Sequence, residues 1–492
     1  MELDNKNIWY QALKSKDTKF DGQFFVGVAS TGIYCRPVCR AKLSKVKNCT
    51  FYSTAAAAEQ DGYRPCLLCR PELAPGNALV DASSSLAERA TKILEENCGR
   101  GQTIEEVAHD LGCTDRHLRR VFSKEYNVSP VQYLQTCRLL LAKNLLTDTD
   151  ISILDVAMAS GFGSLRRFND AFKKQYRLTP TNLRKQTNNT NTMGNTICLS
   201  LGYRPPYRWK EMLTFLSTYK IPRVELVEDD VYYRNVHLKT DTGELVQGWI
   251  KVKQHPKKNM LIVHVDSTLL SVIPQVLARV RHIFDLTCDP QAVHESLKQM
   301  DTIDSKIINL GTRLPGCFDP FEMAVRTILG EGNNREETNI VVGQFVERYG
   351  SSLYTVKGLT HTFPTPEDIK NFDETNSQYS KPFTIDKTKL NTILLLANIF
   401  IDKKIDFYHC VNPKEETEKL VSLLGISRQC ALHIAMRTML WTDVVIDKNF
   451  EIIKVLPSKV RTEVLNISKS LRPWRSYAII SLWNYIYQEE EK

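Results

Sequence analysis

Two short stretches, STGIYCRPVCRAK at residues 30–42 and GYRPCLLCRP at residues 62–71, place four cysteines close together in one amino-terminal segment. The cysteines form two pairs, with C-x3-C and C-x2-C spacing: Cys35 and Cys39, then Cys66 and Cys69. Two such pairs separated by one connecting segment give the ligand spacing of a tetrahedral zinc site. Residues 1–78 hold little apolar sequence, so we expect a small α/β domain that zinc stabilises.

Basic residues surround both cysteine pairs. The same stretches and the segment between them contain these Lys and Arg side chains: Arg36, Arg40, Lys42, Lys45, Lys47, Arg64 and Arg70. A zinc-bound thiolate in a cationic field stays ionised and nucleophilic at neutral pH. Most sites with this spacing are nevertheless closed and purely structural. The spacing alone leaves both interpretations open.

A nucleophilic thiolate beside DNA has a natural electrophile in the methyl group of a phosphotriester. Direct displacement yields S-methylcysteine, a neutral thioether, so the site loses one negative charge. Two like charges ~8 Å apart repel by about 2 kcal/mol at an effective dielectric constant of about 20. Removing one such repulsion against a phosphate backbone raises DNA affinity by more than about tenfold. A one-way reaction of this kind would act as a switch.

The composition describes a globular protein. The 492 residues, 42% hydrophobic and 25% charged, suggest about three domains. No apolar run approaches the ~20 residues of a membrane helix, and the start, MELDNKNIWY, lacks the regions of a signal peptide. The 13 cysteines favour metal ligands and free thiols in a reducing compartment. We therefore expect a cytoplasmic protein that does not enter membranes.

The net charge of +9 is distributed unevenly. Residues 1–187 carry 27 Lys and Arg against 20 Asp and Glu, whereas the remainder carries 38 against 36. Basic character confined to one part of a chain is typical of nucleic-acid binding. The alternative is a basic surface that only keeps the protein in solution.

Residues 83–187 contain an internal repeat. VAHDLG at 107–112 recurs as VAMASG at 156–161, and Phe122, Tyr126 and Pro130 recur as Phe172, Tyr176 and Pro180. Each copy has a helix pattern, a Gly turn and a second helix with basic residues on its exposed face. This is the pattern of a helix-turn-helix motif, whose second helix enters the major groove of DNA. Two copies favour an all-α DNA-binding domain over chance packing of short helices.

The second half of the chain reads as two further regions after a polar linker at residues 188–195. Residues 196–285 contain strand-like segments at 231–238, 245–252 and 260–265 with helices around them, which predicts an α+β subdomain. From residue 286 to residue 490 apolar residues recur at helical spacing, so an all-helical bundle is expected. The predicted fold class is multidomain α+β.

The two cysteine stretches resemble the methylphosphotriester-repair domain of Ada-type adaptive-response proteins, over residues 8–75. The resemblance implies that Cys35 is the methyl acceptor and that the other three cysteines complete the zinc site. It also implies that four residues hold the DNA backbone: Thr31, Arg40, Lys42 and Arg64. Lys42 stands where this family usually has Arg, so the charge is kept but a bidentate phosphate contact is lost.

Residues 83–187 resemble the paired helix-turn-helix domain of AraC-type regulators, which follows the repair domain in the Ada family. The recognition helices would run from about residue 114 to 124 and from about 164 to 174. Candidate base-reading residues are Arg116, His117, Arg119, Arg120, Arg166 and Arg167. The resemblance implies a monomeric transcriptional activator whose partners are double-stranded DNA and RNA polymerase. The Pro-Cys-His-Arg loop of guanine-repair domains is absent from the sequence.

Residues 196–490 resemble AlkA-type alkylpurine DNA glycosylases of the helix-hairpin-helix superfamily. The matching stretches are PPYRWKEMLTFL, RLPGCFDPFEMAVRTILG and RPWRSYAIISLW. The resemblance implies an enzyme that flips the damaged nucleotide into an aromatic pocket, with Trp483 in that pocket. A carboxylate then stabilises the positive sugar. An ungapped alignment puts Asn449 at that carboxylate, whereas counting from Gly425 selects Asp447.

Several positions depart from the glycosylase pattern. Ser427 replaces the second Gly of the hairpin, Gly332 lies where an apolar wedge is expected, and Gln429 and His433 replace aromatic residues. These departures, with Asn449, keep a second hypothesis open. In it the glycosylase fold only binds damaged DNA, and the chain is a methylation-triggered transcription factor. A third hypothesis keeps the zinc purely structural in a DNA-binding regulator.

Overall fold

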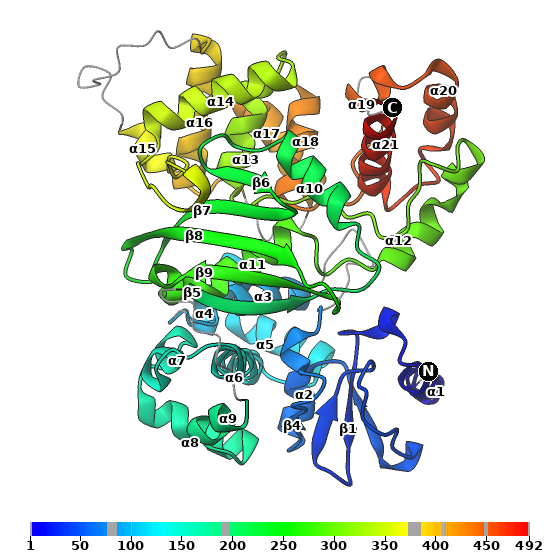
Figure 1. Ribbon diagram of the computed structural model, residues 1–492, viewed down its shortest axis with the longest axis vertical. Helices are drawn as coiled ribbons and strands as arrows, with labels where there is room; N and C mark the ends of the chain where they lie inside the picture. Colours follow the sequence, from blue (N-terminus) through cyan, green and yellow to red (C-terminus); the bar gives the residue numbers. More distant parts are fainter. Residues whose placement is uncertain are drawn as a thin grey trace.

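The computed structural model describes residues 2–75, 86–99, 101–187, 196–371, 385–405, 407, 410, 412–446 and 451–490. Figure 1 shows two tiers, with the chain up to residue 187 below and the remainder above it. The linker predicted at 188–195 lies outside the described residues, so the domain boundaries stay predictions. Among the described helices, none has the length and apolar character needed to cross a membrane.

A four-stranded sheet organises the first 75 residues. Its order is β3-β1-β2-β4, with β1 (Phe25–Val28), β2 (Ile33–Cys35), β3 (Cys49–Tyr52) and β4 (Arg64–Pro65). Around it lie α1 (Glu2–Ser15), η1 (Thr18–Phe20), η2 (Val46–Asn48), α2 (Ala55–Gln60) and η3 (Pro71–Leu73). Strand β1 pairs antiparallel with β2 and β3, whereas β2 and β4 run parallel. The parallel pair brings the two cysteine pairs to the same end of the sheet, because each pair begins at the end of its strand.

Seven helices within the described part of residues 86–187 complete the lower tier. They are α3 (Leu86–Glu96), α4 (Ile104–Asp110), α5 (Asp115–Tyr126), α6 (Pro130–Asp148), α7 (Ile153–Ala159), α8 (Leu165–Tyr176) and α9 (Pro180–Thr187). Helices α4 and α5, and again α7 and α8, form the two helix-turn-helix motifs, and α6 connects them. Gly112 and Gly161 make the turns at φ of 68° and 77°, where other residues are strained. The predicted repeat is confirmed.

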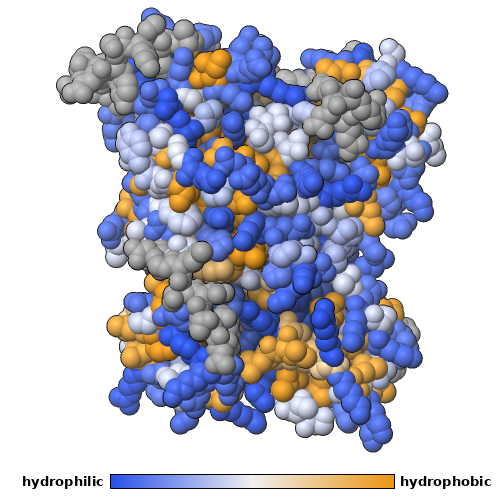
Figure 2. Space-filling view, in the orientation of Figure 1, coloured by the Kyte–Doolittle hydropathy of each residue, from blue (hydrophilic) through white to orange (hydrophobic). Residues whose placement is uncertain are grey.

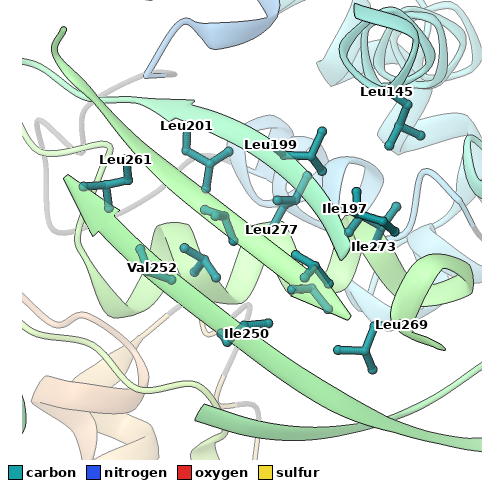
Figure 3. Packing of buried hydrophobic residues seen from close by; sticks show 14 of the residues in the cluster. Leu145, Ile197, Leu199, Leu201, Ile250, Val252, Leu261, Leu269, Ile273 and Leu277 are labelled. Carbon is teal, nitrogen blue, oxygen red and sulfur yellow. The ribbon is translucent and has the colours of Figure 1, made fainter. Parts of the chain in front are cut away.

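A five-stranded antiparallel sheet opens the upper tier, with order β5-β9-β8-β7-β6. The strands are β5 (Thr196–Gly202), β6 (Glu225–Glu228), β7 (Val231–Lys239), β8 (Leu245–Gln254) and β9 (Met260–Asp266). The accompanying helices are α10 (Trp209–Thr218), η4 (Ser267–Val272) and α11 (Ile273–Ile283). Figure 3 shows Ile197, Ile250 and Leu277 from this sheet and α11 in one apolar layer, with Leu145 of α6 beside it.

The rest of the described chain is almost entirely helical. Its elements are α12 (Pro290–Leu297), η5 (Lys298–Thr302), α13 (Pro320–Gly330), α14 (Arg335–Tyr349), η6 (Val356–Gly358), α15 (Pro366–Lys370), α16 (Lys387–Ile401), α17 (Pro413–Leu424), α18 (Arg428–Thr438), α19 (Glu451–Val455), α20 (Ser458–Ile467) and α21 (Arg475–Glu490). Helices α17 and α18 form the predicted hairpin, with Gly425 at φ 65° ending the first. The multidomain α+β fold class is confirmed.

Two apolar cores cross the expected domain borders. Phe25 and Tyr34 of the small sheet share a core with Ile93 and Phe122 of the helix-turn-helix region. Phe168 of α8 shares another with strand β5. Apolar packing therefore joins the small sheet to the helix-turn-helix region, and the helix-turn-helix region to the five-stranded sheet. The sequence patterns did not indicate these contacts.

Candidate metal centre and nucleic-acid interfaces

The four cysteines form one cluster. Cys35 ends β2, Cys66 follows β4, and the loops after them supply Cys39 and Cys69. The four sulfur atoms all lie within 4.8 Å of one another. Three of the cysteines are buried, and Cys69 is half-buried. A tetrahedral zinc ion with Zn–S bonds of about 2.3 Å needs sulfurs about 3.8 Å apart.

The donor set fits zinc. All 13 cysteines are free thiols, so no disulfide competes for these sulfurs. Four thiolates packed this closely repel one another unless a cation lies between them. Soft thiolate ligands in a closed, buried arrangement select zinc over hard cations. The cluster is therefore a zinc-binding site made of Cys35, Cys39, Cys66 and Cys69.

Two of the arginines beside the cluster have structural partners. Arg36 forms an ion pair with Asp21, and its guanidinium also donates to the carbonyl of Cys69 at 3.1 Å. Arg70 binds Asp148 of α6, with 2.7 Å between Nη1 and Oδ1. Both arginines lie beside the cysteines, as the sequence indicates, and their charges are also paired with carboxylates. The long-range carboxylate partners gave no signal in the local sequence.

The residues expected to hold the DNA backbone lie at the surface of the small domain. Thr31, Arg40 and Lys42 are exposed, and Arg64 in β4 is half-buried. Arg64 pairs in register with Ile33, two residues before Cys35, so it lies on the strand beside the predicted nucleophile. We call Arg40, Lys42 and Arg64 the cationic rim of the cluster, because Arg40 follows Cys39 and Arg64 lies two residues before Cys66.

The sequence-predicted base-reading residues all lie on α5 and α8 and are all exposed. Thr114 and Ser164 cap these helices and accept hydrogen bonds from the backbone of residues 117 and 167. Asp115 forms an ion pair with Arg119, 2.8 Å between Oδ2 and Nε. Figure 2 shows hydrophilic side chains at the lower left end of the molecule, where α8 lies in Figure 1. Two basic recognition helices are thus presented to solvent.

The predicted residues of the glycosylase-like half are less exposed to solvent or lie outside the described residues. Trp483 is only 6% exposed. Its ring stacks on Tyr219 with centroids 4.8 Å apart, and Phe215 lies at the same distance. The ring of Tyr219 therefore occupies a face of Trp483 on which a flipped base would stack. Asp447 and Asn449 lie outside the described residues.

Four positions that depart from the family pattern are visible in this half. Ser427 caps α18 and accepts from the backbone of Cys430 at 3.1 Å. Gly332 is exposed at φ 80° with no atom near its Cβ position, so no side chain projects there. Gln429 is half-buried. Burial, with the nearby guanidiniums of two arginines, lowers the pKa of His433 to about 3, so its ring is neutral.

The buried carboxylate of Asp443 is the centre of a clamp that fastens the segment before residue 447. Asp443 accepts from Arg475 at 2.6 Å and from Arg472 at 2.8 Å. Ser476 bridges the same segment, since it accepts from the Val444 amide and donates to the carbonyl of Trp441. The clamp ties this segment to the start of α21, the helix that carries Trp483. Sequence reasoning missed Asp443, although the RPWRSY stretch that supplies its partners was part of the matched motif.

Comparisons with known proteins divide the chain in the same order. The metal-binding domain of Ada matches residues 8–72, a helix-turn-helix domain matches 107–186, and the AlkA N-terminal domain matches 198–319. A probable bifunctional transcriptional activator/DNA repair enzyme AlkA of Mycobacterium tuberculosis is 29% identical over 96% of this chain and 95% of its own length.

Two further relatives each match one half. The bifunctional transcriptional activator/DNA repair enzyme AdaA of Bacillus subtilis is 30% identical over 36% of this chain and 82% of its own length. DNA-3-methyladenine glycosylase 2 of Escherichia coli is 27% identical over 58% of this chain and 96% of its own length. The chain therefore belongs to the Ada family and carries an AlkA-type half behind its Ada-type half.

Proposed function

We propose that this chain is an alkylation-response protein with three activities. It accepts methyl groups from DNA methylphosphotriesters on Cys35, regulates transcription through α5 and α8, and excises alkylated purines as a DNA glycosylase. The observation that carries the proposal is the four-cysteine cluster with a cationic rim, in one chain with two exposed recognition helices. The names of the full-length and half-length relatives support the same combination.

Cys35 is the best nucleophile of the four sulfurs. Backbone amides donate to the other three: Ala41 to Cys39, Cys69 to Cys66, and Arg36 to Cys69. The main interactions of the Cys35 sulfur are instead with the other three sulfurs. A hydrogen bond to a thiolate stabilises the charge and weakens the nucleophile. Cys35 therefore keeps more of its reactivity than its neighbours.

The transfer needs few groups. Zinc, when bound, keeps the four sulfurs ionised at neutral pH. The Cys35 thiolate attacks the methyl carbon, an S–C bond forms, and the C–O bond breaks with its electron pair on the phosphate oxygen. The products are S-methylcysteine and an ordinary phosphodiester anion. Arg40, Lys42 and Arg64 at the rim stabilise the phosphate charge that develops.

The loss of one negative charge links repair to gene regulation. After transfer the cluster repels the DNA backbone less, so the recognition helices hold their site more tightly. We propose that the protein then contacts RNA polymerase and acts as a monomer. Since all 13 cysteines are free thiols, a reducing cytoplasm is the compartment that suits the cluster.

The glycosylase activity depends on a carboxylate near the start of α19. We propose Asp447 for this role, with Trp483 stacking on the flipped base. An alkylated purine already carries positive charge, so its departure needs little acid catalysis. The main catalytic contribution is then electrostatic stabilisation of the positive sugar by the carboxylate.

A second candidate function is favoured by two observations. Tyr219 covers a face of Trp483, and no side chain projects at Gly332 to fill a vacated base stack. In that case this half binds damaged DNA without cleaving the glycosidic bond. The distinguishing experiment compares abasic-site formation on methylated duplex DNA by the wild-type chain, Asp447→Asn and Asn449→Asp. Loss of product only in Asp447→Asn supports the glycosylase, whereas no product from the wild type supports the binding module.

The methyl acceptor is tested by mass spectrometry after exposure to DNA that contains methylphosphotriesters. The wild-type chain should gain one CH2 unit on Cys35, and Cys35→Ser should gain none. Cys49→Ser is the matched control, because Cys49 is a buried cysteine of the same domain outside the cluster. An unmodified wild-type cluster that retains its zinc would refute the transfer and leave a purely structural site.

A further inference from the structure

One face of α6, the helix between the two helix-turn-helix motifs, receives the small zinc domain. The side chains that contact it are Thr136, Lys143, Asn144, Thr147 and Asp148. Their spacing places them along one face of the helix. We call this set the α6 seat. The recognition helices α5 and α8 carry the predicted DNA contacts, so the α6 seat is separate from the DNA-binding residues.

The first contact begins immediately after a zinc ligand. Arg70 follows Cys69, and its guanidinium donates to Asp148, Asn144 and Thr147 at distances from 2.7 to 3.0 Å. Glu72 accepts from Lys143 at 2.5 Å, and both side chains are at most 2% exposed. This ion pair is fully removed from water, so it holds its geometry only while both partners stay together.

The second contact begins immediately before the predicted nucleophile. Tyr34 precedes Cys35 and donates from its hydroxyl to Glu59 at 3.0 Å. Thr136 of the α6 seat donates to the other oxygen of Glu59, also at 3.0 Å. Both cysteine pairs are therefore joined to the same helix, one through Tyr34 and Glu59 and the other through Arg70 and Glu72.

A third contact reaches the second recognition helix itself. Gln175 of α8 donates from its side-chain amide to the carbonyl of Tyr63 at 3.2 Å, one residue before Arg64. The predicted phosphate contact at Arg64 is thus fixed beside α8. Two DNA-binding surfaces held at a fixed angle can contact one duplex at the same time, and both contacts then add to the affinity. Two modules joined by a flexible tether gain less affinity from the second contact, because their relative geometry varies.

We propose that Thr136, Lys143 and Asp148 are positioning residues that make the zinc domain and both helix-turn-helix motifs a single rigid DNA-binding unit. The proposal rests on the proposed function of the zinc site and extends it. The charge lost at Cys35 changes the DNA affinity of the recognition helices because the α6 seat holds the two surfaces on the same stretch of duplex. If the zinc domain separates from the α6 seat, methyl acceptance stays intact but no longer changes the affinity for a specific DNA sequence.

The test uses full-length chains that carry Lys143→Met with Asp148→Asn, and Asp148→Asn alone in case the double variant fails to fold. Both positions lie on α6, and neither is a zinc ligand or a predicted DNA contact. Matched controls make the same changes at exposed positions, Lys298→Met and Asp150→Asn. Three quantities are measured: zinc content, methyl transfer to Cys35, and affinity for a duplex selected from a random-sequence pool with the wild-type chain after exposure to methylated DNA and, separately, without that exposure.

The expected result is a fall in duplex affinity by about tenfold or more, with zinc content and methyl transfer unchanged and both controls like the wild type. Unchanged affinity, or a parallel loss of zinc and methyl transfer, overturns the proposal. The loss should appear in the unmethylated chain as well, because the α6 seat fixes geometry rather than charge. If the wild type accepts no methyl group, the proposed function fails, and the unmethylated comparison still decides the role of the α6 seat.

Discussion

The two reactive regions differ in how their parts are brought together. The zinc cluster draws all its ligands from residues 35–69 and holds their sulfurs within 4.8 Å of one another. The aromatic group around Trp483 combines residues of three elements, including Tyr219 and His433. Metal ligands fix the first region directly, whereas long-range packing decides whether the second is open or closed.

The largest expected effect is that the small four-stranded sheet depends on zinc for its folding, whereas the five-stranded sheet does not. Chelation should abolish protection of the β1 and β2 amides against hydrogen exchange and leave β7 and β8 protected. The reason is that structural zinc contributes roughly 10–16 kcal/mol to folding in small zinc domains. The five-stranded sheet instead belongs to a large apolar core that contains no zinc ligand. Hydrogen exchange with mass spectrometry of the full chain measures both regions at once.

That expectation has a clear contrary outcome. If β1 and β2 keep their protection without zinc, the core shared by Phe25 and Phe122 is sufficient to hold the small sheet. Cys49→Ser serves as a control, since it removes a buried thiol without removing a ligand. Only the ligand-dependent result supports a domain that zinc stabilises.

The next prediction concerns Trp483, which either packs in the core or forms the wall of a base-binding pocket. The loss of stability on its truncation distinguishes the two roles. Trp483→Ala should reduce the free energy of unfolding of the upper tier by about 3–5 kcal/mol, as for buried aromatic residues elsewhere. The physical reason is the close packing of its ring against Phe215 and Tyr219. Denaturant unfolding measures it, with Tyr354→Ala, at a side chain that is 78% exposed, as the matched control.

A loss below about 1 kcal/mol would place Trp483 with surface substitutions rather than core ones. The wall of a pocket that opens for a base would behave in that way. The stacked neighbour Tyr219 would then act as a movable cover.

Local patterns predicted much of this molecule. The repeat at residues 107 and 156 placed α5 and α8 correctly, because a capped helix and a Gly turn are encoded within a few residues. The strand predicted at 231–238 appears as β7, Val231–Lys239. The zinc ligands were predicted from the spacing within each cysteine pair, which is also a local pattern.

Long-range partners could not be predicted in this way. Nothing near Arg70 in the sequence indicates Asp148 as its partner, and nothing near Trp483 indicates Tyr219. Asp443 was missed because a single carboxylate has no local signature until the arginines that bind it are placed. These contacts depend on how elements pack, which a single sequence specifies only through the whole fold.

A smaller effect concerns the buried carboxyl at the α6 seat. Burial raises the pKa of Glu59 to about 8 from its ordinary 4.5. The folded state therefore binds more protons than the unfolded state between these values, so stability falls as pH rises through that window. The slope is at most about 1.4 kcal/mol per pH unit. Denaturant unfolding of the wild type and Glu59→Gln, at pH values across the window, measures the difference.

The variant should lack this pH-dependent contribution, because Gln cannot ionise. Zinc release at low pH affects both chains equally and cancels in the comparison. The matched control is Glu105→Gln at an exposed position, and it should follow the wild type. Parallel curves for Glu59→Gln and the wild type would show that the Glu59 carboxyl titrates alike in both states.

The smallest effect lies in the hairpin between α17 and α18. Ser427 caps α18 through its bond from the Cys430 amide. Ser427→Ala should therefore lower the free energy of unfolding by about 1 kcal/mol, whereas Ser427→Gly should lower it by only a few tenths. Denaturant unfolding separates the two changes. No loss in Ser427→Ala would show that the cap contributes nothing.

The same pair of variants also tests DNA anchoring. Gly lets backbone amides approach a phosphate more closely than Ser does. One added hydrogen bond of about 1 kcal/mol corresponds to roughly fivefold in affinity. Ser427→Gly should therefore bind a non-specific duplex more tightly than the wild type, and Ser427→Ala should not. If neither variant changes the affinity, the upper tier contacts DNA through other residues, and its Ser is retained for the helix alone.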